Sequence, residues 1–402
     1  MLRCPAMKKD LPTPPLARYP EEWGAELVRL GGRAFHGKNV FRWVMNRGVT
    51  DPEKMTDLPQ ALRKSLGEAG LGPVLTVAPG TRAQDRTRKL LVRLADGATV
   101  ETVLIPGVSG ARRLGQGVQD EVSEDADAAA AVDDEEEDEA DEASGSQVLR
   151  VTQCISTQVG CAMGCVFCAS GVAGLKRHLG PDEIVAQVLA GKADLDPDEQ
   201  LRNVVYMGMG EPLHNYDATV RSLRLLTHKD GINLSPRRVT VSTSGLVPEI
   251  GRLGQDFGGQ IGLAISLHAA DDETRSRLMP INRKYPLAPL MDALRAYPLP
   301  RRRRITIEYT LVAGKNDSVA EAKKLVQLLR GLPVKVNLIP MNPIEASTLG
   351  PPGSSGTLSF QKVLLDAGYS CFIRRRRGDD VAAACGQLAL LGAKPKVRVD
   401  RG

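Results

Sequence analysis

Residues 151–168 read VTQCISTQVGCAMGCVFC. The apolar and β-branched run at 151–157 predicts a buried strand, and Cys161, Cys165 and Cys168 follow it with CxxxCxxC spacing. In a reducing compartment, thiols this close together indicate a metal centre rather than disulfides. Zinc normally takes four ligands in two separated pairs, whereas an iron–sulfur cubane held by three cysteines leaves one iron open for a substrate. The spacing favours the iron–sulfur cluster, with zinc as the alternative.

Strand and helix patterns alternate on the carboxyl side of this segment. Apolar runs separated by amphipathic stretches are typical of parallel βαβ units. Six such units over about 200 residues fit an incomplete barrel better than a full eight-unit one, and a doubly wound sheet is the alternative. Either fold places a site at the carboxyl ends of the strands. The strand candidates are residues 151–157, 203–208, 238–244, 260–268, 304–312 and 335–342.

The segments on the amino side have other patterns. Residues 32–48 and 56–70 predict helices, the first from Phe35, Val40, Trp43 and Val44 near helical spacing. Residues 88–106 predict a hairpin that turns at Asp96-Gly97. We therefore divide the chain into a helical, RNA-binding accessory domain (1–75), a hairpin linker with a disordered acidic insert at about 107–146 (76–148), the barrel (149–370) and a C-terminal segment (371–402).

Composition excludes several classes of protein. The chain has 402 residues, 42% of them hydrophobic, and no apolar run approaches the roughly 18 residues that span a bilayer. The proline-rich start does not fit a signal peptide, so we expect a cytoplasmic protein without a membrane partner. The net charge is +5, but residues 120–142 hold 14 acidic residues and no Lys or Arg. Without them, 53 basic residues face 34 acidic ones, a net charge of +19. This favours a nucleic-acid partner over a merely solvated basic surface.

Several further motifs match one family along nearly the whole chain. CxxxCxxC is the signature of the radical S-adenosylmethionine (SAM) superfamily. The sequence is similar to its RNA methyltransferases, which methylate adenine at C2, with a sister group that acts at C8. The matching segments are Phe41-Arg42-Trp43, residues 100–103 (VETV), residues 154–161 (CISTQVGC), residues 208–212 (GMGEP), residues 242–245 (STSG), residues 266–268 (SLH), residues 341–343 (MNP) and residues 377–388 (RGDDVAAACGQL).

The resemblance implies a fold, cofactors and a reaction. The fold is an incomplete (β/α)6 TIM-like barrel of the radical SAM type. Cys161, Cys165 and Cys168 would hold a [4Fe-4S] cluster whose open iron binds S-adenosyl-L-methionine. Two SAM molecules would be consumed for each methylation of C2 of a specific adenine in 23S rRNA, with tRNA as a second candidate substrate. An electron donor such as flavodoxin would reduce the cluster, and we expect the enzyme to act as a monomer.

The resemblance also assigns three catalytic side chains. Cys385 would become S-methylcysteine and carry the carbon radical to the base, Glu101 would accept the ring proton, and Cys154 would release the product through a transient disulfide with Cys385. Without the resemblance, both thiols are ordinary buried small residues and Glu101 is a solvated face residue. The expected SAM contacts are Gly210, Glu211, Ser242, Ser266, Leu267, His268 and Asn342.

Two arginine runs, residues 301–304 and 374–377, are candidates for phosphate contacts. The target adenine must leave its stack to reach a buried site, which favours unpaired RNA. Three alternatives stay open: methylation at C8, a radical enzyme that modifies a protein or small molecule, and a non-catalytic zinc-stabilised RNA-binding factor. Cys371 has no matched role, and we expect it to pack in a strand.

Overall fold

The computed structural model describes residues 13–72, 76–107, 148–345, 347–374, 377, 378, 381 and 383–388. The acidic insert expected at 107–146 lies outside the described residues except for Gly107 at its edge.

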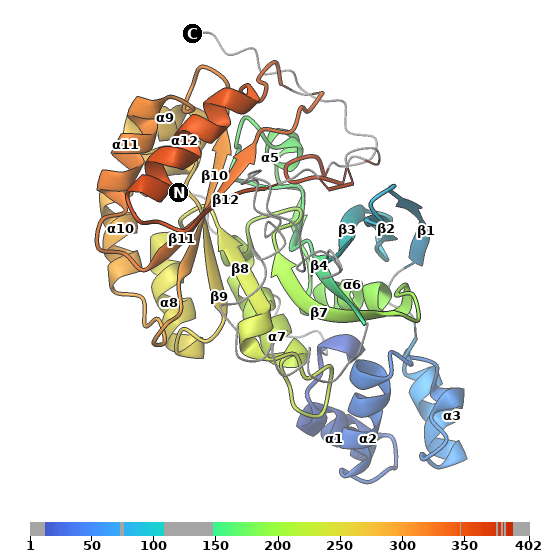
Figure 1. Cartoon of the computed structure of the whole chain (residues 1–402). Helices are drawn as coiled ribbons and strands as arrows, with labels where there is room; N and C mark the ends of the chain where they lie inside the picture. The colour runs from blue at the N-terminus through green and yellow to red at the C-terminus, as the bar shows by residue number, and fades with distance from the viewer. Residues whose placement is uncertain are drawn as a thin grey trace.

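A ten-stranded mixed sheet organises the chain (Figure 1). Its spatial order follows the sequence from one edge to the other, β1-β2-β3-β4-β7-β8-β9-β10-β11-β12. A doubly wound sheet reverses its strand order in the middle, and this one does not. The strands are β1 (Thr76–Arg82), β2 (Arg88–Arg93), β3 (Thr99–Pro106), β4 (Leu149–Cys154), β7 (Glu199–Tyr206), β8 (Val239–Thr243), β9 (Gly262–Ser266), β10 (Ile305–Leu311), β11 (Val334–Pro340) and β12 (Cys371–Ile373).

Within this sheet the strands from β4 to β12 pair in parallel, and helices cover their outer face (Figure 1). β5 (Gln158–Val159) and β6 (Arg177–His178) form a separate antiparallel pair. Because parallel strands are buried on both faces, they carry continuous apolar runs, and every residue of β8 and β10 is buried. The six predicted strands are β4 and β7 to β11, so the incomplete barrel is confirmed, with β12 as a seventh parallel strand. The helices are α5 (Ala169–Ala173), α6 (Pro181–Ala193), α7 (Tyr216–Leu226), α8 (Val247–Phe257), α9 (Asp272–Leu278), α10 (Leu287–Arg295), α11 (Val319–Leu328) and α12 (Ser354–Asp366).

Antiparallel strands extend the sheet beyond β4. β2 and β3 form the predicted hairpin, with Arg93 opposite Thr99 across the turn. β1 adds a third strand, and β3 pairs antiparallel with β4 so that Val103 lies opposite Cys154. This extension therefore leads directly to the start of the barrel.

A small helical region precedes the sheet, at the end of the molecule away from β12 (Figure 1). It consists of α1 (Pro20–Arg29), α2 (His36–Phe41), which continues as a π-helical turn (Arg42–Asn46), and α3 (Gln60–Glu68). Trp23, Phe41 and Met45 are almost fully buried, but Phe35 is 61% exposed. The helix predicted over 32–48 thus begins later than the spacing indicates, because Phe35 precedes α2 rather than lying within it.

Among the residues that the structure describes, no helix is long and apolar enough to cross a bilayer.

Candidate active site

The three cysteines of the CxxxCxxC run line one cavity at the carboxyl ends of the parallel strands. The cavity opens to solvent and has an empty volume of about 920 Å³. Cys161 and Cys165 lie between β5 and α5, and Cys168 directly precedes α5. Other members of its wall come from the carboxyl ends of β8 and β9 and from the loops that follow β7, β8, β9 and β11, as expected for a site in an α/β barrel. Six predicted SAM contacts are among them: Gly210, Glu211, Ser242, Ser266, His268 and Asn342.

The environment of the three thiols fits an iron–sulfur cluster. Burial raises the pKa of Cys161 to about 12 and also raises the pKa values of Cys165 and Cys168. A nearby thiol raises each of these pKa values further, and for Cys168 this thiol is Cys385. A bound cationic cluster offsets this penalty, because metal ions deprotonate the thiols that coordinate them. The backbone N–H of Met163 donates to the Cys161 sulfur, and those of Ser170 and Gly171 donate to Cys168. Hydrogen bonds of this kind tune cysteine-held clusters.

The described part of the chain has no group of three or more His, Cys, Asp or Glu side chains arranged around a single metal ion. This arrangement does not conflict with a cubane, in which each cysteine binds a different iron.

The Gly210–Glu211 loop is held tightly by Gln158. Gly210 has φ +108°, and a Cβ there would lie 2.6 Å from Gln158 Cβ, so only glycine fits. Gln158 Oε1 accepts a hydrogen bond from the Glu211 backbone N–H at 2.9 Å. The amide nitrogen of Gln158 contacts Nδ1 of His178 at 3.0 Å and Nδ1 of His214 at 3.2 Å. The backbone around Glu211 is therefore fixed before any ligand binds.

Glu211 is buried and already satisfied by protein donors. Its Oε2 accepts hydrogen bonds from the backbone N–H and Oγ of Ser244 at 2.7 and 2.8 Å, and Oε1 accepts one from the Leu213 N–H at 3.1 Å. Burial raises the pKa of this carboxyl, and the bonds from Ser244 oppose that rise. The Thr243 hydroxyl opposes the rise as well, so four protein donors face this carboxylate, about as many as an ionised carboxylate has acceptor positions.

His268 is a neutral hydrogen-bond donor in this setting. Its Nδ1 accepts the backbone N–H of Thr310 at 2.8 Å, and burial lowers its pKa to about 3. Since Nδ1 is an acceptor, the single proton of the neutral ring is on Nε2. Leu267, the remaining predicted SAM contact, is fully buried in the core and is not part of the cavity wall.

Cys385 lies between this cavity and Cys154. A second cavity, of about 520 Å³, is lined by Cys154, Cys168 and Cys385, and Cys385 and Cys168 line the first cavity as well. Burial raises the pKa of the Cys154 thiol to about 12, the nearby Cys385 raises it further, and Arg374 opposes the rise. The tertiary structure thus brings together two thiols that are 231 positions apart in the sequence.

The Cys385 loop is tied to the barrel by its backbone. The Cys385 carbonyl accepts a hydrogen bond from Asn342 Nδ2 at 2.9 Å, and the Gly386 carbonyl accepts one from the Ala169 N–H at 2.9 Å. Ser170 Oγ donates to the Leu388 carbonyl at 2.6 Å. Asn342, expected as a SAM contact, therefore also positions the loop that carries Cys385.

Glu101 is buried on β3 and forms an ion pair with Lys89 on β2 at 3.1 Å. Val103, two residues along the same face of the strand, lines the cavity of Cys154 and Cys385, but Glu101 is not among the residues of either wall. Glu101 thus lies next to the site rather than within the cavities.

Two further charged residues belong to the site: Glu308, which sequence reasoning missed, and Arg374, which it singled out only as a candidate phosphate contact. Glu308 lies inside the barrel, where its Oε1 accepts a hydrogen bond from Asn337 Nδ2 at 3.0 Å, and Arg374 Nη1 lies 4.0 Å from its Oε2. Both residues line the larger cavity, and Arg374 lines the smaller one too. A carboxylate in the middle of the apolar run ITIEYTL was the available signal for Glu308.

The two arginine runs lie in different places. The run at 301–304 directly precedes β10, at the amino ends of the strands, which is the edge opposite the cavities. Arg374 is the first residue after β12 and lines both cavities. Arg374, at the start of the second run, is therefore close to the site, whereas residues 375 and 376 lie outside the described residues.

Comparisons with known proteins agree with this geometry. Residues 155–329 match the radical SAM superfamily, and residues 21–70 match the ribosomal RNA large subunit methyltransferase N-terminal domain. The chain is 70% identical over 391 residues to the dual-specificity RNA methyltransferase RlmN of Sorangium cellulosum, covering 97% of this chain and 99% of that one. It is 43% identical over 362 residues to RlmN of Geobacter sulfurreducens, covering 90% and 88%. A crystal structure of a radical SAM methyltransferase from Sphaerobacter thermophilus matches with a TM-score of 0.78 and 38% identity, over 94% of this chain and 99% of that one.

Proposed function

This chain belongs to the RlmN family of radical SAM RNA methyltransferases, and we propose that it methylates C2 of a specific adenine in 23S rRNA and in tRNA. As a radical SAM enzyme it uses a [4Fe-4S] cluster and SAM. The observation that carries the proposal is the cavity shared by Cys154 and Cys385, which adjoins the cavity of the CxxxCxxC thiols. A methylating enzyme that needs only a methyl cation has no use for this second pair of thiols.

We assign the cofactor contacts from the cavity walls. Cys161, Cys165 and Cys168 would hold the cluster, which, when bound, supplies the electron that cleaves SAM. Gly210, Glu211, Ser242, Ser266, His268 and Asn342 would bind SAM, with backbone and carboxylate acceptors near its ammonium group and hydroxyl donors near its ribose and carboxylate. Leu267 would support its neighbours from the core.

The protein's own residues then carry the methyl group to the base. The Cys385 thiolate takes the methyl group from one SAM molecule, displaces S-adenosylhomocysteine and becomes a thioether, a step suited to a sulfur nucleophile. One hydrogen atom of that methyl group passes to the 5′-deoxyadenosyl fragment of a second SAM molecule, and the methylene carbon adds to adenine C2, which joins protein and RNA covalently. Glu101 accepts the C2 proton, and the adduct gives up one electron, which would return to the cluster. The Cys154 thiolate attacks the sulfur of Cys385, the S–C bond breaks with its electron pair left on carbon, that carbon takes up a proton to become the methyl group, and a Cys154–Cys385 disulfide forms as the RNA leaves.

The function is tested on nucleosides. We would incubate cluster-loaded protein with SAM, reduced flavodoxin and unmodified 23S rRNA or tRNA, and identify the methylated nucleoside by mass spectrometry. The expected product is 2-methyladenosine. 8-Methyladenosine would contradict the position, and the absence of any methylated adenosine with both RNAs would contradict the function.

The thiol roles are tested by trapping. Cys154→Ala should stop the reaction after RNA is attached to Cys385 and give a protein–RNA band that survives denaturant. Cys385→Ala should give neither a band nor a product. Cys371→Ala is the matched control, because Cys371 is a buried thiol on β12 that lines neither cavity. If Cys154→Ala turns over normally, its proposed role is wrong.

Metal analysis tests the cluster. Protein purified without oxygen should contain about four irons per chain, and Cys165→Ala should lose most of them. Zinc in place of iron would contradict the cluster and favour the RNA-binding factor.

We further propose the partners and the division of the chain. Residues 1–75 would contact RNA as an accessory domain, 76–148 would form the hairpin linker with its insert, 149–370 the barrel and 371–402 the segment that carries Cys385. A monomer in the cytoplasm, reduced by flavodoxin, is the working form that we propose. Removal of residues 1–75 should weaken RNA binding in a filter assay while leaving SAM binding unchanged.

A further inference from the structure

The turn between β1 and β2 touches the C-terminal segment that carries Cys385. We call residues 83–87 the Asp85 turn. Asp85 Oδ1 accepts the backbone N–H of Thr87 at 3.0 Å, which closes the turn, and Oδ2 accepts the backbone N–H of Gly378 at 3.1 Å. Arg377 Nη1 lies 3.9 Å from the same carboxylate. Burial acts to raise the pKa of Asp85, but the hydrogen bonds from Thr87 and Gly378 and the charge of Arg377 outweigh it and lower the pKa.

Gly378 fits against this turn because it has no side chain. Its φ is +61°, and a Cβ would lie 2.9 Å from Thr87 Cγ2 and 2.8 Å from Ala383 Cβ. The Gly378 carbonyl accepts the backbone N–H groups of Val381 at 3.2 Å and Ala383 at 3.0 Å. Gly378 therefore connects Asp85 to Ala383, because it donates one hydrogen bond to Asp85 and accepts one from Ala383. Ala383 is two residues before Cys385.

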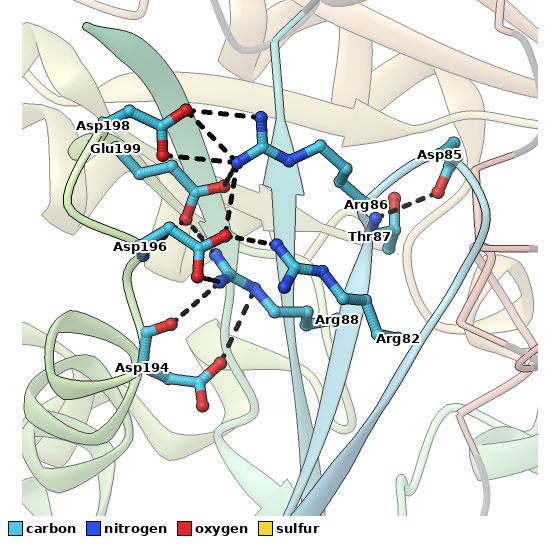
Figure 2. Close-up of polar contacts among 9 residues, drawn as sticks. All are labelled: Arg82, Asp85, Arg86, Thr87, Arg88, Asp194, Asp196, Asp198 and Glu199. Carbon is cyan, nitrogen blue, oxygen red and sulfur yellow. Dashed lines mark hydrogen bonds and ion pairs between the residues drawn. The ribbon is translucent and has the colours of Figure 1, made fainter.

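Arginines on both sides of the Asp85 turn fix it to the barrel (Figure 2). Arg86 and Arg82 pair with acidic residues of the loop between α6 and β7, with Arg86 Nη2 3.2 Å from Asp196 Oδ2. Arg88 and Glu199 form the innermost pair, with side chains 6% and 0% exposed. A single exposed ion pair contributes little to stability, but a network around a buried pair fixes the position of the turn that carries it. The acidic partners are Asp194, Asp196, Asp198 and Glu199.

We propose that Asp85 is a positioning residue that docks the C-terminal segment so that the Cys385 sulfur faces both Cys154 and the cavity of the cluster thiols. The inference rests on the proposed function for its purpose. The far end of the same loop is held by Asn342, Ala169 and Ser170. The Asp85 turn holds the other end of the loop through Gly378. The antiparallel extension is thereby joined to the segment that carries Cys385.

The docking is measured without catalysis, through the Cys154–Cys385 disulfide. In full-length, cluster-loaded protein equilibrated with reduced and oxidised glutathione under argon, the disulfide fraction gives the effective concentration of one thiol toward the other. Asp85→Ala removes the acceptor for Gly378, and Asp85→Asn keeps an oxygen acceptor without the charge. Asp96→Ala is the matched control: Asp96 also accepts a backbone N–H two residues on, in the next turn of the same sheet, and its other oxygen pairs with Arg177 instead of the C-terminal segment.

Asp85→Ala should lower the effective concentration about tenfold, because a hydrogen bond to a charged group is lost. Asp85→Asn should lower it less, and Asp96→Ala should match the wild type. An Asp85→Ala value within about twofold of Asp96→Ala would overturn the proposal. If Asp85→Ala lowers the thermal unfolding temperature more than Asp96→Ala does, Gly378→Ala becomes the deciding variant. It disrupts the contact between Asp85 and Gly378 from the side of Gly378, and it should lower the effective concentration by a similar factor. An unchanged value in Gly378→Ala would then overturn the proposal.

The same variants separate this inference from the proposed function. The disulfide equilibrium needs neither RNA nor SAM, so it reports docking even in a protein that methylates nothing. In the methylation assay, Asp85→Ala should lower kcat about tenfold and leave KM for RNA within about twofold, which is the pattern of a residue that positions a catalytic group.

Discussion

Burial decides the reactivity of individual residues in the site, and Cys154 illustrates this. The thiol is 8% exposed and lies beside Cys385. An acid whose pKa is raised to about 12 is almost entirely protonated at pH 7. In the mechanism that we propose, the attack of Cys154 therefore depends on a small fraction of thiolate, which Arg374 increases because its charge opposes the rise in pKa.

We predict that alkylation of Cys154 by iodoacetamide, followed by mass spectrometry of its peptide, accelerates about tenfold per pH unit from pH 7 to 10 without a plateau. An ordinary thiol in the unfolded protein should level off near its pKa of about 8.5. Arg374→Gln should slow the reaction at each pH. A plateau below pH 9 in the folded protein would contradict the buried thiol.

Glu101 is the second residue whose surroundings matter for its role. It pairs with Lys89 on the neighbouring strand, so a neutral glutamine retains the shape but cannot take a proton. We predict that Glu101→Gln lowers the single-turnover rate of methylation by about 10²–10⁴, with RNA trapped on Cys385. Glu53→Gln, at an exposed ion pair with Arg63 in the helical region, is the control. Normal turnover of Glu101→Gln would show that another group accepts the proton.

Between elements, the Arg88–Glu199 pair joins β2 to β7. The two strands are not neighbours in the sheet, and Figure 2 shows how the arginines of the β1–β2 hairpin reach the acidic loop before β7. Both side chains are buried, and Glu199 Oε2 also accepts the backbone N–H of Asp196 at 2.9 Å. Removal of the Glu199 charge leaves the buried Arg88 with its longer ion pairs to Asp194 and Asp196, at 3.5 and 3.6 Å.

We predict that Glu199→Gln lowers the free energy of unfolding by about 3 kcal/mol, as for other broken buried pairs. Glu273→Gln, which affects an exposed pair with Arg277, should change it by about 0.5 kcal/mol or less. Urea titration followed by circular dichroism measures both. Equal values for the two variants would show that the buried pair does not hold the hairpin.

Across the whole molecule, charge is divided unevenly between residues 120–142, which hold 14 acidic residues and no Lys or Arg, and the rest of the chain. That acidic stretch lies outside the described residues, and its composition is unsuited to a packed core. We predict that its deletion leaves the thermal unfolding temperature within about 2 °C and the methylation rate within about twofold of the full chain. Differential scanning calorimetry and the nucleoside assay check this. A collapse of expression or turnover would show that the stretch is part of the working enzyme.

Local patterns in the sequence were sufficient for much of the fold. Continuous apolar runs marked six of the seven parallel strands, because those strands are buried on both faces, and the Asp96-Gly97 turn marked the hairpin. β12 was not counted among the barrel strands, because its three residues are too short a run to show a period. Phe35 was misjudged because helical spacing alone does not say where a helix begins.

The sequence by itself determined the family, the CxxxCxxC thiols and six of the parallel strands, since each follows from the pattern of neighbouring residues or from an ordered set of short motifs. Only the tertiary structure brought Cys385 into the cavity of Cys154, put the run at 301–304 at the far edge of the barrel, and joined Asp85 to Gly378. Those contacts connect residues that are far apart along the chain. They form because parallel pairing aligns the ends of distant strands and because an antiparallel extension, held by ion pairs, meets the C-terminal segment there.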